Sequence, residues 1–246
     1  MTMTTTYSSA YGSFSFEEGF YNQNKELIDA YFDRAELRNT YGIDVEGHEG
    51  VCFGFDGTGY GSMQKSLPWV LSPVCIKDEE LSAGEKGQVD LFRKLYALMI
   101  VAHTRVTFEY TDIAIGDGFG FYVRQKATII PNSHRDGSDL TNFFSVESCT
   151  TEDLGYNDRN IINAGYENGY DLRNEDDVKY LKDDYLNNWY QRQGKEYQSK
   201  YSLDCVIEAL KKLANDSPTY NGAIAEWRFD DDCGDVVRAA MLNATK

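Results

Sequence analysis

The chain has 246 residues, of which 14% are aromatic and 26% are charged, and its formal net charge at pH 7 is −16. A chain of this length can bury about 70% of its unfolded surface, and its aromatic content excludes an intrinsically disordered protein. The negative charge opposes direct binding to nucleic-acid phosphates or to anionic membranes and favours basic partners. A simpler interpretation of the same charge is an acidic surface that only aids solubility.

Cysteine usage and the first residues bear on the compartment. The five cysteines are far apart and include no Cys-x-x-Cys pair, so we expect a reducing compartment rather than a disulfide framework or a zinc ribbon. The chain begins without the basic and apolar regions of a signal peptide. No apolar run approaches the roughly 20 residues that cross a bilayer. These features predict a cytoplasmic protein that makes no membrane contact.

Residues 1–16 carry no charge and are rich in Thr, Ser and Tyr. We expect a flexible arm or an edge strand, and a partner or a second subunit would order it, because chain termini are loose unless they are tied down. Such an arm would join copies of the chain into a homo-oligomer. After it, apolar residues such as Leu27, Tyr31 and Phe32 recur at helical spacing, which predicts a helix over residues 24–41.

A Gly-rich segment occupies residues 47–62, and we expect it to be a loop that contains a short strand at Val51–Phe53. Pro68 and Pro73 then bracket Trp69–Leu71. Because proline donates no hydrogen bond to a sheet, this stretch predicts an irregular or edge strand.

Residues 88–130 form the clearest pattern in the chain. Apolar residues from Val89 to Ile100 recur at steps of three and four, which predicts a helix. Apolar and polar residues then alternate over 106–111 and 119–129, as in half-buried strands, and Asp117-Gly118 is typical of a hairpin turn. We therefore expect an α+β fold, with an antiparallel sheet built on this central helix and hairpin and with flanking helices.

The C-terminal part is expected to extend the same domain. Residues 143–149 predict a strand, and residues 151–175 are dense in Asn, Asp and Gly and predict loops. The pattern predicts helices over 175–197, from the N-cap Ser202 to Leu213, and from Asp230 to Met241, with a short strand at 223–229. We expect residues 17–246 to form a single α+β domain.

Residues 51–62 resemble the first motif of haloacid-dehalogenase-type phosphatases, an apolar strand that ends in Asp-x-Asp-Gly-Thr. Asp56, Gly57 and Thr58 match the second half of that motif. Gly54 stands where the family has its nucleophilic Asp, so the aspartyl-phosphate intermediate and one metal ligand are both lost. A degenerate metal-dependent hydrolase that uses the loop around Asp56 is one alternative function.

The sequence predicts no catalytic residue, no cofactor and no metal site. The sequence has three histidines, and none lies three or four residues from another, as metal ligands on one helix would. They are His48, His103 and His134. Asp230–Asp232 are typical of a helix N-terminus, since a metal site needs ligands that converge from several segments. We therefore lean towards a protein that is not an enzyme.

A binding surface is the best candidate for a function. Residues 151–187 hold ten acidic and four basic residues, interleaved with Tyr, which supplies rigid contact area at low entropic cost. Carboxylates along such a face would take the place of nucleic-acid phosphates in the basic groove of a partner protein. The predicted partner-binding residues are Asp153, Tyr156, Asp158, Tyr166, Glu167, Tyr170, Asp171, Asp176, Asp177, Tyr180, Asp183 and Asp184.

The leading hypothesis is a non-enzymatic acidic protein that engages a basic, nucleic-acid-binding protein through this surface, as an inhibitor would. In composition, its acidity and its Tyr and Asn content resemble small phage-encoded proteins that act on host machinery. A self-assembling structural or scaffold protein, joined through residues 1–16, is the second hypothesis. The hydrolase is the third.

Overall fold

The computed structural model describes residues 7–33, 44–60, 62–72, 83–114, 120–133 and 143–244. The chain divides into two compact units, Met1–Leu154 and Gly155–Lys246, called the N-terminal unit and the C-terminal unit below. Each unit has its own cluster of buried apolar side chains, and the two clusters share no residue. The single domain expected over residues 17–246 stays a prediction, since two compact units with separate cores can still belong to one domain.

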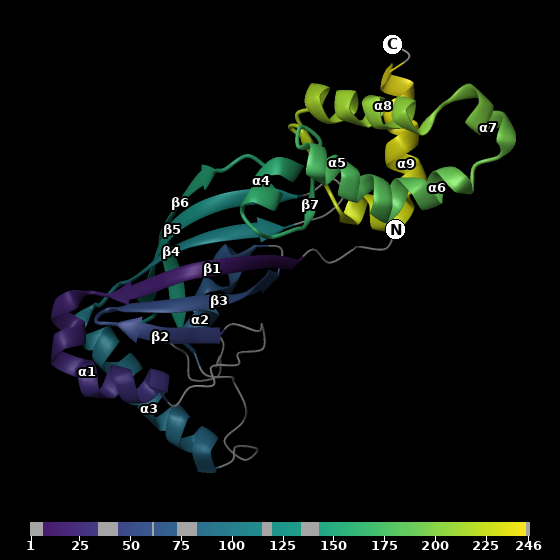
Figure 1. Ribbon diagram of the computed structural model, residues 1–246. Coiled ribbons are helices and arrows are strands. Elements are labelled where there is room, and N and C mark those ends of the chain that lie inside the picture. The colour runs from purple at the N-terminus through teal and green to yellow at the C-terminus, as the bar shows by residue number, and fades with distance from the viewer. Residues whose placement is uncertain are drawn as a thin grey trace, which may run out of the picture. The chain divides into compact units, whose positions relative to one another are not determined.

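A six-stranded antiparallel sheet, in the order β2-β3-β1-β4-β5-β6, forms the N-terminal unit together with three helices (Figure 1). The strands are β1 (Tyr7–Phe16), β2 (Asp44–Glu49), β3 (Cys52–Tyr60), β4 (Val106–Ala114), β5 (Phe121–Pro131) and β6 (Phe144–Asp153). The helices are α1 (Glu18–Asp33), α2 (Met63–Val70) and α3 (Ala83–Ala102). The predicted α+β fold is confirmed, and so are its central helix, now α3, and its hairpin, now β4 and β5.

An aromatic row across three neighbouring strands organises the core of this unit. Phe14 of β1 lies opposite Phe53 of β3 and opposite Phe108 of β4. The ring centroids are 5.2 Å and 5.3 Å apart, and all three side chains are at most 1% exposed. Because a one-residue slip would turn these rings to the other face of the sheet, the row fixes the register of all three strands.

Of the two alternatives for the first residues, Tyr7–Phe16 forms a strand rather than a flexible arm, but it lies inside the sheet between β3 and β4 and not at an edge. Ala10, Phe14 and Phe16 are buried, so the lack of charge serves a central strand. At Gly12, a Cβ atom would lie only 2.3 Å from the carbonyl oxygen of Glu109. Residues 1–6 lie outside the described residues. Self-assembly through residues 1–16 stays a hypothesis, although residues 7–16 are part of the sheet.

Two other stretches differ from the expectation. The strand expected at Trp69–Leu71 is instead the last two residues of α2, which contains Pro68, and the turn that follows it. A distant residue favours this helix, since Met63 N–H at its start donates to Asp112 Oδ2 of β4 at 2.8 Å. The Gly-rich loop is instead made of β2 and β3, and its Asp56 lies in the middle of β3. The expected turn at Asp117-Gly118 lies outside the described residues.

The C-terminal unit consists mainly of helices around a two-stranded antiparallel sheet of β7 and β8. Its elements are α4 (Asp158–Asn163), β7 (Gly169–Asp171), α5 (Glu175–Leu181), η2 (Lys182–Leu186), α6 (Asn187–Gln191), α7 (Lys195–Lys200), α8 (Leu203–Asp216), β8 (Ala223–Ala225) and α9 (Trp227–Ala244). The predicted N-cap is confirmed, because Ser202 Oγ accepts a hydrogen bond from Cys205 N at 3.1 Å. Across the described ranges, no helix is both long enough and apolar enough to pass through a membrane.

Candidate functional site

One predicted binding residue, Asp158, is part of the interior. It is 2% exposed, and its two oxygens accept hydrogen bonds from Arg228 Nε at 2.7 Å and Nη2 at 2.9 Å. Ala225 N–H donates to the same carboxylate at 2.9 Å. The guanidinium carbon of Arg228 lies 4.3 Å from the centroid of the Trp227 ring. Asp158 therefore fastens α4 to β8 and α9, and it is not available to a partner.

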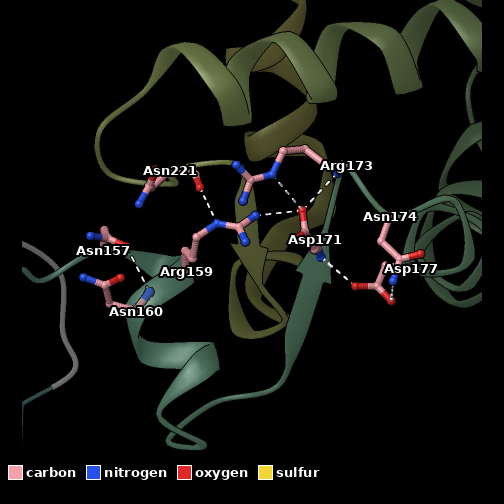
Figure 2. A network of polar contacts seen from close by, with 8 residues as sticks. All are labelled: Asn157, Arg159, Asn160, Asp171, Arg173, Asn174, Asp177 and Asn221. Carbon is pink, nitrogen blue, oxygen red and sulfur yellow. Dashed lines mark hydrogen bonds and ion pairs between the residues drawn. The ribbon is translucent and has the colours of Figure 1, made fainter.

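A second network, shown in Figure 2, ties α4 to β7 and to the turn before β8. Asp171 Oδ1 lies 2.7 Å from Arg159 Nη2 and 3.3 Å from Arg173 Nε. Arg159 Nε also donates to the carbonyl oxygen of Asn221 at 2.6 Å, and Asp177 Oδ2 accepts from the backbone N–H of Asp171 at 2.9 Å. The charge of Asp171 is thus matched by two arginines.

Four other acids gather around two tyrosines, and we call Glu167, Asp184, Glu226 and Asp230 the carboxylate cluster. Tyr170 Oη donates to Asp184 Oδ2 at 3.2 Å. Tyr185 Oη lies 3.0 Å from Glu226 Oε1 and 2.5 Å from Asp230 Oδ1. The cluster draws on the segment before β7, on η2, on the residue between β8 and α9, and on α9.

An aromatic platform holds the two phenols in place. The ring of Phe229 lies 6.0 Å from that of Tyr170 and 5.5 Å from that of Tyr185, and Phe229 is 2% exposed. Tyr185 and Asp184 belong to η2, a stretch of π-helix that interrupts the helix between α5 and α6. Such π-turns are rare and are frequent at functional sites.

The hydrogen bonds leave negative charge unmatched. Tyr185 has one hydroxyl proton and two carboxylate neighbours, so it cannot fully satisfy both. Within the described residues, no ion pair includes any member of the carboxylate cluster. Asp184 and Asp230 are exposed, whereas Glu167 and Glu226 are half-buried.

The pKa values of Glu167, Tyr170 and Tyr185 reflect the same excess of negative charge. Burial raises the pKa of the Glu167 carboxyl, and the nearby charges of Glu226 and Asp230 raise it further. Burial likewise raises the pKa of Tyr170 and of Tyr185, and the surrounding carboxylates add to both shifts. A cation placed among these groups would lower the free energy of the charged carboxylates.

Three of the predicted binding residues, Glu167, Tyr170 and Asp184, come together in or beside this cluster. The others are spread more widely. Asp153 is the last residue of β6 in the N-terminal unit. Exposed positions are occupied by Asp176, Tyr180 and Asp183, and half-buried ones by Tyr156, Tyr166 and Asp177.

The sequence analysis missed Tyr185, Glu226 and Asp230 as site residues. Tyr185 has the spacing of a core residue, and Asp230 has the place of an ordinary acid near a helix start. Glu226 is brought to Tyr185, 41 positions earlier in the chain, by the packing of η2 against the start of α9. The one local signal was the group of acids at 230–232, which the sequence analysis assigned to a helix N-terminus.

Other chemistry finds little support in the geometry. Among the residues that the structure describes, no group of three or more His, Cys, Asp or Glu is arranged to hold a metal ion. Asp56 lies in an antiparallel strand, opposite Asp44 of β2 and Tyr11 of β1. Comparison with known proteins finds no family model, no curated protein and no solved structure that matches the chain. A functional proposal must therefore rest on the site itself.

Proposed function

We propose that the C-terminal unit binds a basic protein through the carboxylate cluster, and that the chain acts by binding rather than by catalysis. The observation that supports this is the pair of carboxylates that share the single hydroxyl proton of Tyr185. Four acids held near one another, with no cation paired to them among the described residues, carry a repulsive cost. A partner's Lys or Arg would relieve that cost, and the relief would add to the binding free energy.

Arginine fits this site better than lysine. A guanidinium donates several hydrogen bonds in a fixed plane, so one Arg can reach two carboxylates at once, as Glu226 and Asp230 beside Tyr185 would require. The exposed phenol ring of Tyr180 and the exposed carboxylates of Asp176 and Asp183 extend the acidic, Tyr-rich surface along α5 and η2.

The partner class we propose is a nucleic-acid-binding protein. Its binding groove presents several Lys and Arg side chains that normally meet phosphates, and such contacts weaken steeply with salt. Carboxylates that replace the phosphates would occupy the same groove, so this chain would compete with nucleic acid for the partner.

The test is fluorescence anisotropy with a fluorescein-labelled peptide of alternating Arg and Gly. The site variant is Glu226→Gln with Asp230→Asn. The matched control is Glu109→Gln with Glu152→Gln, which removes the same charge from carboxylates paired with Lys126 and Arg124. We expect the site variant to weaken binding about tenfold, which is 1.4 kcal/mol, and the control to change it less than about twofold, within the range of exposed ion pairs.

Further arms test the specificity of the interaction. Binding should weaken between low and physiological salt, because exposed charges are screened. A DNA duplex should displace the protein from the peptide without binding the protein itself. Equal losses in the site variant and the control would mean that net charge alone attracts the peptide, and the proposal would fail.

A further inference from the structure

A groove of about 490 Å³ lies in the C-terminal unit, between one face of α9 and the segment that contains α6 and α7. Its volume is within the range of roughly 300–1,000 Å³ that is usual for ligand sites. Most of the side chains that line it are apolar or aromatic. The lining residues are Trp189, Gln193, Tyr197, Tyr201, Gly234, Val237, Arg238, Met241 and Leu242.

The groove begins one helical turn from the carboxylate cluster on both of its walls. On α9, the lining residue Gly234 follows Asp230 of the cluster by four positions. On the other wall, the lining residue Trp189 follows Tyr185 by four positions. Residues four apart on a helix lie on the same face, and the 2.5 Å hydrogen bond from Tyr185 Oη to Asp230 Oδ1 joins the two walls at this end. The cluster and the groove are therefore consecutive parts of one surface.

The aromatic wall of the groove is held in place by its own contacts. The Tyr197 ring lies 5.7 Å from Trp189 and 5.1 Å from Tyr201, measured between centroids. Tyr190 Oη donates to the carbonyl oxygen of Tyr201 at 2.6 Å, which fastens the end of the α7 segment to α6. A wall of this kind is formed before any ligand arrives, so little order must be created on binding.

The α9 wall leaves apolar surface in water. Leu242 is 67% exposed, which is high for a large apolar side chain, and Met241 beside it is half-buried. Apolar side chains of a partner that covered this surface would remove it from water, and this burial would favour binding.

The lining itself adds little net charge. Among the described residues that line the groove, Arg238 alone is charged, and it forms an ion pair with Asp235 one turn earlier. Lys200 lies against the lining, with its Nζ 5.1 Å from the centroid of the Tyr201 ring. Four carboxylates of the cluster outnumber this one base, so the surface as a whole is negative.

The sequence of the two walls gives the same sign. Residues 184–201 and 226–242 together carry seven acidic and five basic residues. One of those bases, Arg228, is matched by Asp158 outside the walls. An apolar groove that continues into a cluster of carboxylates complements a ligand that carries apolar side chains along its length and a cation at its end.

We propose that the basic partner of the carboxylate cluster binds through an amphipathic helix whose apolar side chains lie in this groove. This inference rests on the proposed function, since it names the part of the partner that the C-terminal unit holds. From Asp230 to Met241, α9 runs for about 16 Å at 1.5 Å per residue, which is the length of about three helical turns. Leucine-like side chains on two turns of the partner lie between the tyrosines and Leu242, and an Arg on the next turn reaches Glu226 and Asp230.

The test uses fluorescein-labelled peptides of about 16 residues, which is enough for more than three helical turns. The first peptide has Leu at steps of three and four on a background of Ala and Gln, with Arg at both ends, so that either direction along the groove brings an Arg to the cluster. A Ser twin replaces each Leu by Ser, and a Gln twin replaces each Arg by Gln.

The groove variant is Leu242→Ser, at an exposed position. Its matched control is Val101→Ser on α3, at a position that is 80% exposed. The cluster variant is again Glu226→Gln with Asp230→Asn, and circular dichroism checks that all variants are folded. Trp189→Phe identifies the part of the tryptophan emission that comes from the groove.

We expect the Leu peptide to bind about tenfold more tightly than its Ser twin, because its Leu side chains leave water. Leu242→Ser should weaken binding of the Leu peptide about fivefold and leave the Ser twin unchanged, while Val101→Ser changes either by less than about twofold. The cluster variant should weaken both of these peptides about tenfold, and the Gln twin should bind the wild type about tenfold more weakly than the Leu peptide. The emission of Trp189 should shift when the Leu peptide binds and not when the Ser twin binds.

The outcomes separate this inference from the proposed function. If the Ser twin responds to the cluster variant but Leu adds no affinity, or adds affinity that is indifferent to Leu242→Ser, the helix in the groove is wrong and the proposed function stands. If neither peptide responds to the cluster variant, the proposed function fails and this inference fails with it. A wild-type dimer in sedimentation velocity that Leu242→Ser dissolves would also overturn the inference, because the occupant of the groove would then be a second copy of the chain.

Discussion

The two units use their charged side chains in different ways. In the N-terminal unit, three acids of β4 and β6 are matched by bases of β5 or of the residue before β4. The pairs are Arg105 with Glu147 at 2.8 Å, Arg124 with Glu152 at 3.1 Å, and Lys126 with Glu109 at 2.5 Å. In the C-terminal unit, arginines match the acids that hold α4, while the carboxylate cluster accepts hydrogen bonds from phenols and takes part in no ion pair among the described residues. Charge pairing, rather than charge density, therefore separates the acids that serve the fold from those that we propose to bind a partner.

The largest expected effect is on the C-terminal unit. Asp158→Ala leaves the half-buried guanidinium of Arg228 without its two hydrogen bonds to Asp158, which should lower the free energy of unfolding by about 3 kcal/mol. Hydrogen exchange measured by mass spectrometry should show lost protection in peptides from residues 155–246. Glu152→Ala, which breaks an exposed pair, should change stability by less than about 0.5 kcal/mol. Equal losses of stability in the two variants would mean that the Asp158 pair contributes no more than an exposed ion pair.

The next effect is on the N-terminal unit. Gly12→Ala places a Cβ 2.3 Å from the Glu109 carbonyl oxygen and 2.5 Å from Tyr110 Cα, so β1 and β4 cannot keep their spacing. We expect a loss at the upper end of about 1–3 kcal/mol in urea denaturation. Gly84→Ala on α3 meets nothing within 4 Å and should be neutral or stabilising by up to about 1 kcal/mol. If Gly12→Ala left the free energy of unfolding unchanged, residues 7–16 would not be packed between β3 and β4.

A smaller change in stability is expected when charges are removed from paired and from unpaired carboxylates. Glu226→Gln with Asp230→Asn should raise the stability of the C-terminal unit by a few tenths to about 1 kcal/mol, because it removes repulsion among like charges. Glu109→Gln with Glu152→Gln should not raise stability, since those acids have basic partners. Thermal unfolding of the two variants at low salt gives the comparison. A destabilised Glu226→Gln, Asp230→Asn variant would mean that these acids serve the fold.

The smallest effect is the pH dependence of stability, which should have opposite signs at two glutamates. Arg105 holds the pKa of Glu147 below its ordinary value, so its contribution is present above the unfolded pKa of about 4.3 and is lost as pH falls through the folded pKa. The pKa of Glu167 is raised, so its contribution is present below the unfolded pKa and is lost as pH rises through the folded pKa.

Urea denaturation from pH 3 to pH 8 measures both contributions. Glu147→Gln should remove a loss of stability that occurs at acid pH, and Glu167→Gln should remove a gain of stability on acidification from neutral pH. If stability changed with pH in the same direction at both glutamates, the difference in charge pairing between the two units would be contradicted.

The parts of the fold that could be predicted are those specified by nearby residues. The helical spacing of α3, the alternation in β4 and β5, and the N-cap at Ser202 all lie within a few residues of what they determine. The place of β1 could not be predicted, because its neighbours β3 and β4 come from about 40 and 100 residues later in the chain. The helix α2 was missed because its first N–H is satisfied by Asp112 of a distant strand.

The candidate site divides in the same way. The density of acids and tyrosines after residue 151 pointed to Glu167, Tyr170 and Asp184, because composition is visible in sequence. Composition does not show that Asp158 is paired with Arg228 and Asp171 with Arg159, 70 and 12 residues away. Nor does it show that Tyr185 meets Glu226 and Asp230, since packing of distant segments makes those contacts.

The most direct measurement is the pH titration of the Glu167 side-chain carboxyl by carbon-detected NMR, with and without the Arg-Gly peptide. We predict a pKa above the ordinary glutamate value in the free protein, a decrease when the peptide binds, and a decrease in the Glu226→Gln, Asp230→Asn variant. A Glu167 that titrates at or below the ordinary value in the free protein would mean that a cation already matches these carboxylates, and the proposed binding surface would be lost.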